Sequence, residues 1–168
     1  QLARACVASS TQIAFFSSIA EMVHRYLDHE TAVRIIPQIM QMNLSGSMNL
    51  TEPGCGSDLG MIKTSATRNE DGTFLLNGQK IFITNGGGGL QFVLARIKGA
   101  PEGLEGISMF FVEQDVNGKL NYQVTKNEEK MGMHGSFTTV ITYENSIGRL
   151  VGKENEGFKY MLHLMNEA

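Results

Sequence analysis

The sequence predicts an α+β fold in which an antiparallel β-barrel or sandwich stands between helical segments. Apolar residues recur at steps of three and four near both ends of the chain, whereas in between the period changes to two. The middle segments are short, are bounded by Gly, Asn and Asp, and have no helical pattern between them. That combination is typical of antiparallel barrels and sandwiches. The expected order is therefore helix, β-domain, helix.

The first predicted helix carries an apolar stripe along one face. Its members are Ile13, Phe16, Ala20, Val23 and Leu27. A second helix is expected to start at Asp28 or His29 and to run to Ile35. Because Pro37 has no backbone N–H, we expect this helix to end before it and a short successor to cover Pro37–Met42.

After Ser45-Gly46-Ser47 the period of apolar residues changes to two, which predicts strands. The predicted strands are Ser47–Thr51, Lys63–Arg68, Thr73–Leu76, Gln79–Thr84, Gln91–Ile97, Gly106–Glu113, Leu120–Val124 and Thr138–Glu144. Glu70–Gly72 and Asn77–Gly78 carry turn residues of the hairpin type. From Asn155 onward the helical spacing returns. Since the chain starts at Gln1 inside one expected helix and stops inside another, we expect it to be a fragment of a longer protein.

The composition excludes several classes of partner. A formal net charge of −3 offers no basic field, so we expect no nucleic acid. Cys6 and Cys55 show neither disulfide nor metal-ligand spacing, so neither a disulfide framework nor a metal site is expected. No apolar run has the length of a membrane span, and the start does not resemble a signal peptide. We expect the bacterial cytoplasm or, in a eukaryote, the mitochondrial matrix.

The stretch MNLTEPGCGSDLG, at 48–60, has glycines close to the spacing of a dinucleotide fingerprint. A Rossmann loop must lead into a helix, whereas this one leads into a predicted strand, which excludes a nicotinamide site. The glycine tract Gly86–Gly89 fails the same test. The residues alone leave two alternatives for the 48–60 stretch: a plain turn, or an anion nest of backbone N–H groups with the Ser57 hydroxyl as a further donor.

Other candidate residues have simpler explanations. Glu21 and His24 have the spacing of half a di-iron site, but no second pair exists in the chain. His134 and Ser136 lack a third member that would orient them as a catalytic pair. Glu52, which precedes a proline at a strand end, is interpreted as a turn or capping acceptor rather than as a general base.

Four motifs, in order and spacing, resemble the acyl-CoA dehydrogenase family. They are MNLTEPGCGSDLG (48–60), LNGQKIFITNG (76–86), KMGMHGSFTT (130–139) and LVGKENEGFKYMLHLMNEA (150–168). The amino-acid sequences of these motifs are most similar to those of the longer, 3-methylmercaptopropionyl-CoA dehydrogenase-like members. The resemblance implies that residues 1–43 end an amino-terminal helical domain, that 44–150 form the middle β-domain, and that 151–168 start a carboxy-terminal helical domain.

The resemblance implies FAD as the cofactor. The implied cofactor-binding residues are Met48, Leu50, Thr51, Gly56, Ser57, Phe82, Ile83 and Thr84. In such proteins the Leu50 and Thr51 backbone and the Thr51 hydroxyl would meet the pyrimidine edge of the flavin, and Thr84 would bond near N5. Phe82 stands where many relatives have tryptophan. Ser57 would contact FAD phosphate and lie near the acyl-CoA, and Asn166, at a position where shorter-chain relatives carry a CoA-contacting aspartate, is the second implied substrate-binding residue.

The implied reaction is the α,β-dehydrogenation of an acyl-CoA thioester to a trans-2-enoyl-CoA, with hydride transfer to flavin N5. The implied partners are the acyl-CoA substrate, an electron-transfer flavoprotein and further copies of the chain in a homo-dimer or homo-tetramer. The family's catalytic glutamate would lie beyond Ala168, so no catalytic residue is assigned here and the isolated chain is expected to be inactive. Two alternatives stay open: an acyl-CoA oxidase or other flavin oxidase or monooxygenase of the superfamily, and a non-catalytic scaffold.

Overall fold

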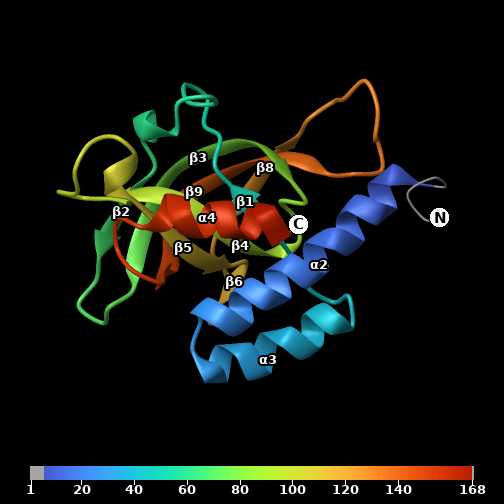
Figure 1. The fold of residues 1–168 in the computed structure, drawn as a ribbon, viewed down its shortest axis with the longest axis horizontal. Coiled ribbons are helices and arrows are strands. Elements are labelled where there is room, and N and C mark those ends of the chain that lie inside the picture. The colour runs from blue at the N-terminus through green and yellow to red at the C-terminus, as the bar shows by residue number, and fades with distance from the viewer. Residues whose placement is uncertain (1–5, 168) are drawn as a thin grey trace.

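Two consecutive helices precede the sheet in the computed structural model, which describes residues 6–167 (Figure 1). Helix α2 spans Val7–Tyr26 and helix α3 spans His29–Met40. The Asp28 carboxylate accepts a hydrogen bond from the Thr31 N–H at 2.8 Å, which satisfies a backbone donor that has no partner within the helix. The predicted start of the second helix is therefore confirmed.

The strands and a last helix follow. The strands are β1 (Ser45–Asn49), β2 (Ser65–Arg68), β3 (Phe74–Thr84), β4 (Gly89–Ile97), β5 (Ile107–Glu113), β6 (Asp115–Val116), β7 (Lys119–Leu120), β8 (Gln123–Asn127) and β9 (Thr138–Val151). Two 3₁₀ turns, η1 (Leu59–Met61) and η2 (Leu104–Gly106), interrupt the loops, and helix α4 spans Gly157–Glu167. No helix among residues 6–167 is long and apolar enough to cross a membrane.

Strands β4, β2, β3, β9 and β5 close into a barrel, because each pairs with the next and β5 pairs back with β4. Strand β1 extends the edge of β4, and β8 pairs with β9. Strand β4 runs parallel to β1 and β2, whereas the other pairs are antiparallel. The predicted barrel is confirmed, and only the two parallel pairings of β4 depart from the antiparallel arrangement that was expected.

Strands β4 and β5 are buried on both faces. On the outer face Phe92 and Phe111 pack against the helices with their ring centroids 5.4 Å apart. On the inner face Val93 and Phe110 lie in the core of the barrel. Successive side chains of a strand point to opposite faces, so two cores require an almost continuous apolar sequence in these strands.

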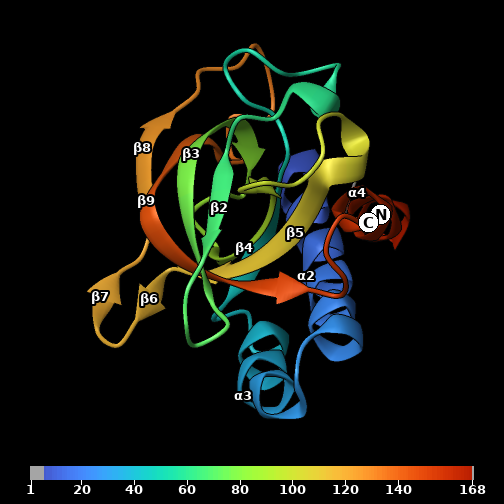
Figure 2. The same cartoon turned by 90° about the vertical axis from the view of Figure 1, so that its left-hand side faces the viewer.

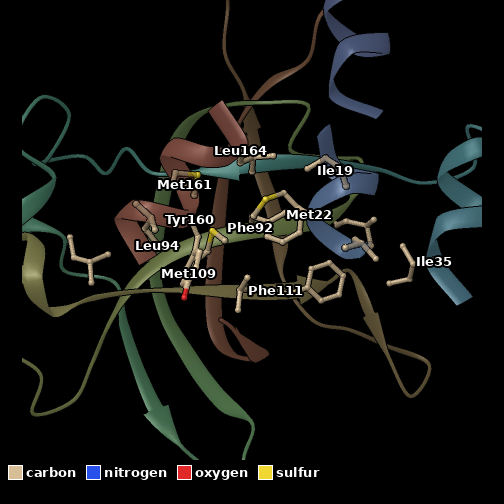
Figure 3. Packing of buried hydrophobic residues seen from close by; sticks show 14 of the residues in the cluster. Ile19, Met22, Ile35, Phe92, Leu94, Met109, Phe111, Tyr160, Met161 and Leu164 are labelled. Atoms are coloured by element: carbon tan, nitrogen blue, oxygen red, sulfur yellow. The ribbon is translucent and has the colours of Figure 1, made fainter. Parts of the chain in front are cut away.

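The helices cover one side of the barrel (Figure 2). Side chains from α2, α3, α4, β4 and β5 meet in the layer between them, where Met22, Met161 and Leu164 are at most 1% exposed (Figure 3). Helix α4 returns to this layer from the far end of the chain and packs against β5 and α2. The amino- and carboxy-terminal helices therefore share one core with the outer face of the barrel.

The predicted helix break at Pro37 is wrong, because α3 continues through this residue to Met40. Proline removes the one hydrogen bond that would run to the carbonyl of Val33. Val33 is 60% exposed, so its face of the helix lies toward water, which can satisfy that carbonyl. Ile35 and Ile39, on either side of the proline, are buried and hold the helix against the core.

The predicted hairpin at Asn77–Gly78 is also wrong, because β3 is one strand with a bulge at this point. A Cβ atom on Gly78 would lie 2.4 Å from the Thr64 hydroxyl oxygen. The glycine is thus required for a close approach between two segments rather than for a turn. The other predicted turn, Glu70–Gly72, does join antiparallel strands β2 and β3.

The predicted strand Leu120–Val124 is divided between β7 and β8. Asn121 lies at the division, and its side chain donates to the carbonyls of Glu113 and Ile147 at 2.9 and 2.8 Å. Such side-chain bonds compete with the ladder of a continuous strand.

Truncating Leu164 tests the shared helical core. Because this side chain is fully buried, we expect Leu164→Ala to lower the free energy of unfolding by about 2–5 kcal/mol. Leu162→Ala is the matched control, because Leu162 lies in the same helix and is 43% exposed. Urea denaturation measures both variants, and equal losses would contradict the packing described for α4.

Candidate functional site

The end of β1 and the bulged end of β3 meet at one rim of the barrel. The Ile81 N–H donates to the Thr51 carbonyl at 2.9 Å. Directly after β3, the Asn85 side chain donates to the Ser45 hydroxyl and to the Gly46 carbonyl, both at 2.9 Å. The first bond fixes the segment after β1 against β3, and the Asn85 bonds fix the start of β1 against the residue that follows β3. We refer to Met48, Leu50, Thr51, Phe82 and Thr84 as the β1–β3 surface.

Phe82 is the structural outlier of the β1–β3 surface. Its φ is +57°, in the left-handed region that bulky residues rarely adopt, and its side chain is 61% exposed. It lies in the register shift between Lys80 and Ile83, where β3 departs from regular pairing with β9. The fold thus holds a strained backbone that presents an aromatic ring to solvent, a combination that typically marks a functional site.

A buried ion pair lies beneath this surface. Lys80 is fully buried, and its Nζ donates to the Glu52 carboxylate at 2.8 Å and to the Leu50 carbonyl at 2.9 Å. Glu52 also accepts from the N–H groups of Lys63 and Thr64 and from the Thr64 hydroxyl, at 2.8, 3.0 and 2.6 Å. The prediction that Glu52 acts as a capping acceptor is therefore confirmed.

Each charge of this pair opposes the pKa shift that burial causes in the other group. Burial lowers the pKa of Lys80 to about 8, although the Glu52 carboxylate opposes the shift. For Glu52, burial alone would raise the pKa, but the Lys80 ammonium and the bonds from Thr64 and Lys63 outweigh it and hold the pKa below the ordinary 4.5. Both groups are thus charged at neutral pH, and the pair together connects three backbone segments.

The loop between Thr51 and Thr64 has further internal supports. The backbone groups of Glu52 and Cys55 bond each other in both directions, and the Cys55 thiol donates to the Asp58 carbonyl at 2.7 Å. Arg96 of β4 donates to the Gly60 carbonyl at 2.8 Å. The glycine-containing loop is therefore held at both ends, by Lys80 near its start and by Arg96 near its end.

Strand β1 is fixed from inside the barrel by a buried polar network. The Asn49 amide donates to Gln91 at 2.8 Å and also bonds the Tyr143 hydroxyl. The hydroxyl of Ser47, which also lies on β1, donates to the side-chain amide oxygens of Asn49 and Gln91. Burial raises the pKa of Tyr143 well above its ordinary value, so this hydroxyl stays neutral and serves as a hydrogen-bonding group. The inward side of β1 is thereby specified, and its continuation into Leu50 has little freedom.

The structure brings most of the predicted cofactor-binding residues to this rim. Met48, Leu50, Thr51 and Thr84 are half-buried, Phe82 is exposed, and Gly56 and Ser57 are exposed in the following loop. Ile83 is 2% exposed and packs inside the barrel, so only its backbone is available to a ligand. Asn166 is exposed on α4 and makes no hydrogen bond to the β1–β3 surface within residues 6–167.

Lys80 was not identified from the sequence as part of the site. A lysine inside a strand usually lies on its solvent face. Only the tertiary contact with Glu52, which the structure reveals, explains why this lysine is buried. Glu52 precedes Lys80 by 28 residues, so no local spacing indicates the pair.

The residues of the rim are suited to bind and orient a ligand. The hydroxyls of Thr51, Ser57 and Thr84 make no hydrogen bond within residues 6–167, so each is free to meet a ligand. Phe82 offers an apolar face beside them. Lys80 and Glu52, which lie beneath the rim, are buried and bond each other. This arrangement suits a flat, polar-edged aromatic ligand better than proton transfer to a substrate.

Comparison with known proteins defines the class. Residues 47–146, more than half of the chain, match the family described as the acyl-CoA dehydrogenase middle domain. The chain therefore belongs to the acyl-CoA dehydrogenase family, as its motifs predict. The barrel with its flanking helices superimposes on butyryl-CoA dehydrogenase of Megasphaera elsdenii with a TM-score of 0.86 and 29% identity, over 99% of this chain and 44% of that one.

Two individual relatives show which members of the family this chain is similar to. The chain is 42% identical over 136 residues to 3-methylmercaptopropionyl-CoA dehydrogenase of Ruegeria pomeroyi, an alignment that covers 74% of this chain and 23% of that protein. It is 37% identical over 142 residues to an acyl-CoA dehydrogenase of Bacillus subtilis, with 83% and 36% covered. The chain thus spans less than half the length of these relatives.

Removing one partner of the buried pair tests its role in stability. We expect Lys80→Met to lower the free energy of unfolding by about 3–5 kcal/mol, because it leaves the Glu52 charge buried without a counter-ion. Lys126→Met is the matched control: Lys126 also forms an ion pair, but it is 63% exposed, and the change should stay within about 0.5 kcal/mol. Thermal unfolding at pH 7 measures both. A small effect of Lys80→Met would contradict the structural role of the pair.

The pKa of Glu52 predicts how stability changes in acid. Because the pKa in the folded protein lies below 4.5, the unfolded chain binds the proton first, and the stabilisation by the carboxylate is complete above about pH 4.5 and is lost as the pH falls through the folded-state value. We expect the stability difference between the parent protein and Glu52→Gln to shrink between pH 5 and pH 3. Denaturant titrations across this range measure the difference, and a constant value would show that the carboxylate is not preferentially ionised in the fold.

Proposed function

We propose that this chain supplies the flavin-binding face of an FAD-dependent acyl-CoA dehydrogenase. The observation that carries the proposal is Phe82, an exposed aromatic residue held at positive φ beside the free Thr51 and Thr84 hydroxyls. Backbone strain of this kind persists only where the surrounding fold enforces it, and the ring it presents matches the face of an isoalloxazine. The family to which the chain belongs supports the same assignment.

The residues of the rim fit the cofactor in chemical character. In this proposal Phe82 lies against the flavin ring, Thr84 bonds near N5, and the Leu50 and Thr51 backbone with the Thr51 hydroxyl meets the pyrimidine edge. Gly56 and Ser57, both exposed, take the phosphate side, and Met48 lies along the ring. Bound FAD would supply hydride acceptance from the substrate β-carbon. The chain's own contribution is to place the ring, donate hydrogen bonds to its polar edge and cover one face.

The proposed reaction converts an acyl-CoA thioester to a trans-2-enoyl-CoA. Ser57 and Asn166 are proposed to contact the substrate, and the general base is proposed to lie outside this chain. Residues 1–43, 44–150 and 151–168 are proposed to belong to the amino-terminal helical, middle and carboxy-terminal helical domains. We also propose that the assembled enzyme is a homo-dimer or homo-tetramer.

The electron acceptor is proposed to be an electron-transfer flavoprotein. A solved structure described as the electron transferring flavoprotein of Acidaminococcus fermentans is similar to this chain, with a TM-score of 0.81 and 28% identity. The proposed location is the bacterial cytoplasm or the mitochondrial matrix, because relatives occur in Bacillus subtilis and as a mitochondrial isobutyryl-CoA dehydrogenase in Dictyostelium discoideum.

The decisive experiment is an anaerobic titration of the purified complete gene product with a short acyl-CoA, followed in the visible spectrum. A yellow protein whose flavin band bleaches with substrate supports a dehydrogenase. Rapid reoxidation of the bleached flavin by O₂ would favour an oxidase of the superfamily. A colourless protein that takes up no added FAD would reject the proposal in favour of a scaffold. The 168-residue chain alone is expected to show no turnover.

Phe82 provides the matching mutational test. We expect Phe82→Ala to weaken FAD binding about tenfold, since stacking on an aromatic ring is worth about 1–3 kcal/mol, and Phe82→Trp to keep it. Leu120→Ala is the control, because Leu120 is 64% exposed on the separate β6–β7 hairpin. Fluorescence titration of the apoprotein with FAD gives the three affinities. Equal weakening by both alanine variants would remove Phe82 from the site.

A further inference from the structure

The Leu50–Thr51 peptide group is bound on one side and free on the other. Its carbonyl oxygen accepts at 2.9 Å from the ammonium of Lys80, whose side chain is fully buried. Its N–H, on Thr51, makes no hydrogen bond within residues 6–167. The peptide bond is trans, so the N–H points away from the carbonyl and hence away from the buried lysine.

Two anchors prevent this peptide group from rotating. The Leu50 carbonyl is held by Lys80, and the next carbonyl, on Thr51, accepts from the Ile81 N–H at 2.9 Å. The ammonium is in turn held by the Glu52 carboxylate, which is itself fixed by Thr64. The free N–H is therefore aimed in one direction before any ligand arrives.

We propose that Lys80 is a positioning residue that polarises the Leu50–Thr51 peptide group and so strengthens the Thr51 N–H as a donor to a flavin. A cation on a carbonyl oxygen withdraws electron density through the amide, and linked hydrogen bonds strengthen one another. A stronger donor at the pyrimidine edge favours the reduced flavin, which carries more negative charge there, over the oxidised one. Lys80 thereby tunes the flavin potential without touching the flavin. This inference rests on the proposed function.

The test compares the flavin potential of the complete gene product with that of Lys80 variants, measured by dithionite titration against a reference dye. In Lys80→Met the preference for reduced over oxidised FAD should fall about tenfold, which for a two-electron couple lowers the potential by about 30 mV. Lys80→Gln, which keeps a neutral donor for the Leu50 carbonyl, should lie between the parent and the methionine variant. Lys126→Met, a change at an exposed lysine, should leave the potential unchanged.

A second variant separates the charge effect from a folding defect. Lys80→Met with Glu52→Gln removes both charges of the pair, leaves no buried unpaired ion, and keeps an acceptor for the Thr64 N–H. Its potential should fall as in Lys80→Met. Variants that bind FAD at an unchanged potential would reduce Lys80 to a structural role and overturn the inference. If the parent protein itself takes up no FAD, the proposed function fails instead.

Discussion

The ion pair between Lys80 and Glu52 is the interaction on which the architecture of the site depends. A buried pair of this kind contributes little net stability over an apolar pair, because desolvation offsets the attraction between the charges. What it adds is specificity: Lys80 comes from the bulged end of β3, Glu52 follows β1, and the carboxylate binds the segment that leads into β2. Three segments far apart in sequence are thus held in one register around two charges.

The barrel makes such a buried pair possible. Strands β4 and β5 are apolar on both faces, so one core fills the barrel and another joins its outer wall to the helices. This double burial leaves the rim, where β1 ends and β3 bulges, as a place where polar groups are concentrated. The rigid wall supports the rim, and the rim carries the strained Phe82 backbone and the free hydroxyls.

The sequence predicted the barrel, the flanking helices and most of the strands, because the periods of apolar residues report directly on burial. It failed where a local signal was overridden by a distant contact. Asn77–Gly78 has the composition of a hairpin turn, yet Gly78 is there to admit Thr64. Pro37 is a helix breaker, yet the flanking isoleucines hold its helix on the core. Lys80 was missed for the same reason, since its partner lies on another segment.

The positions of the candidate site residues show why a sequence motif predicts the segments of a site more readily than the role of each side chain. The motif identifies the segments that are proposed to approach a cofactor, because their order and spacing are read directly from the sequence. It does not distinguish side chains that face the ligand from those that orient them: Ile83 lies within the motif but points into the barrel, whereas Lys80 is buried beneath the surface that it organises. In this fold the electrostatic character of the rim comes from a residue that no ligand would touch. In the proposed mode of binding, Lys80 acts on the Thr51 N–H through the Leu50 carbonyl and makes no contact with the ligand itself.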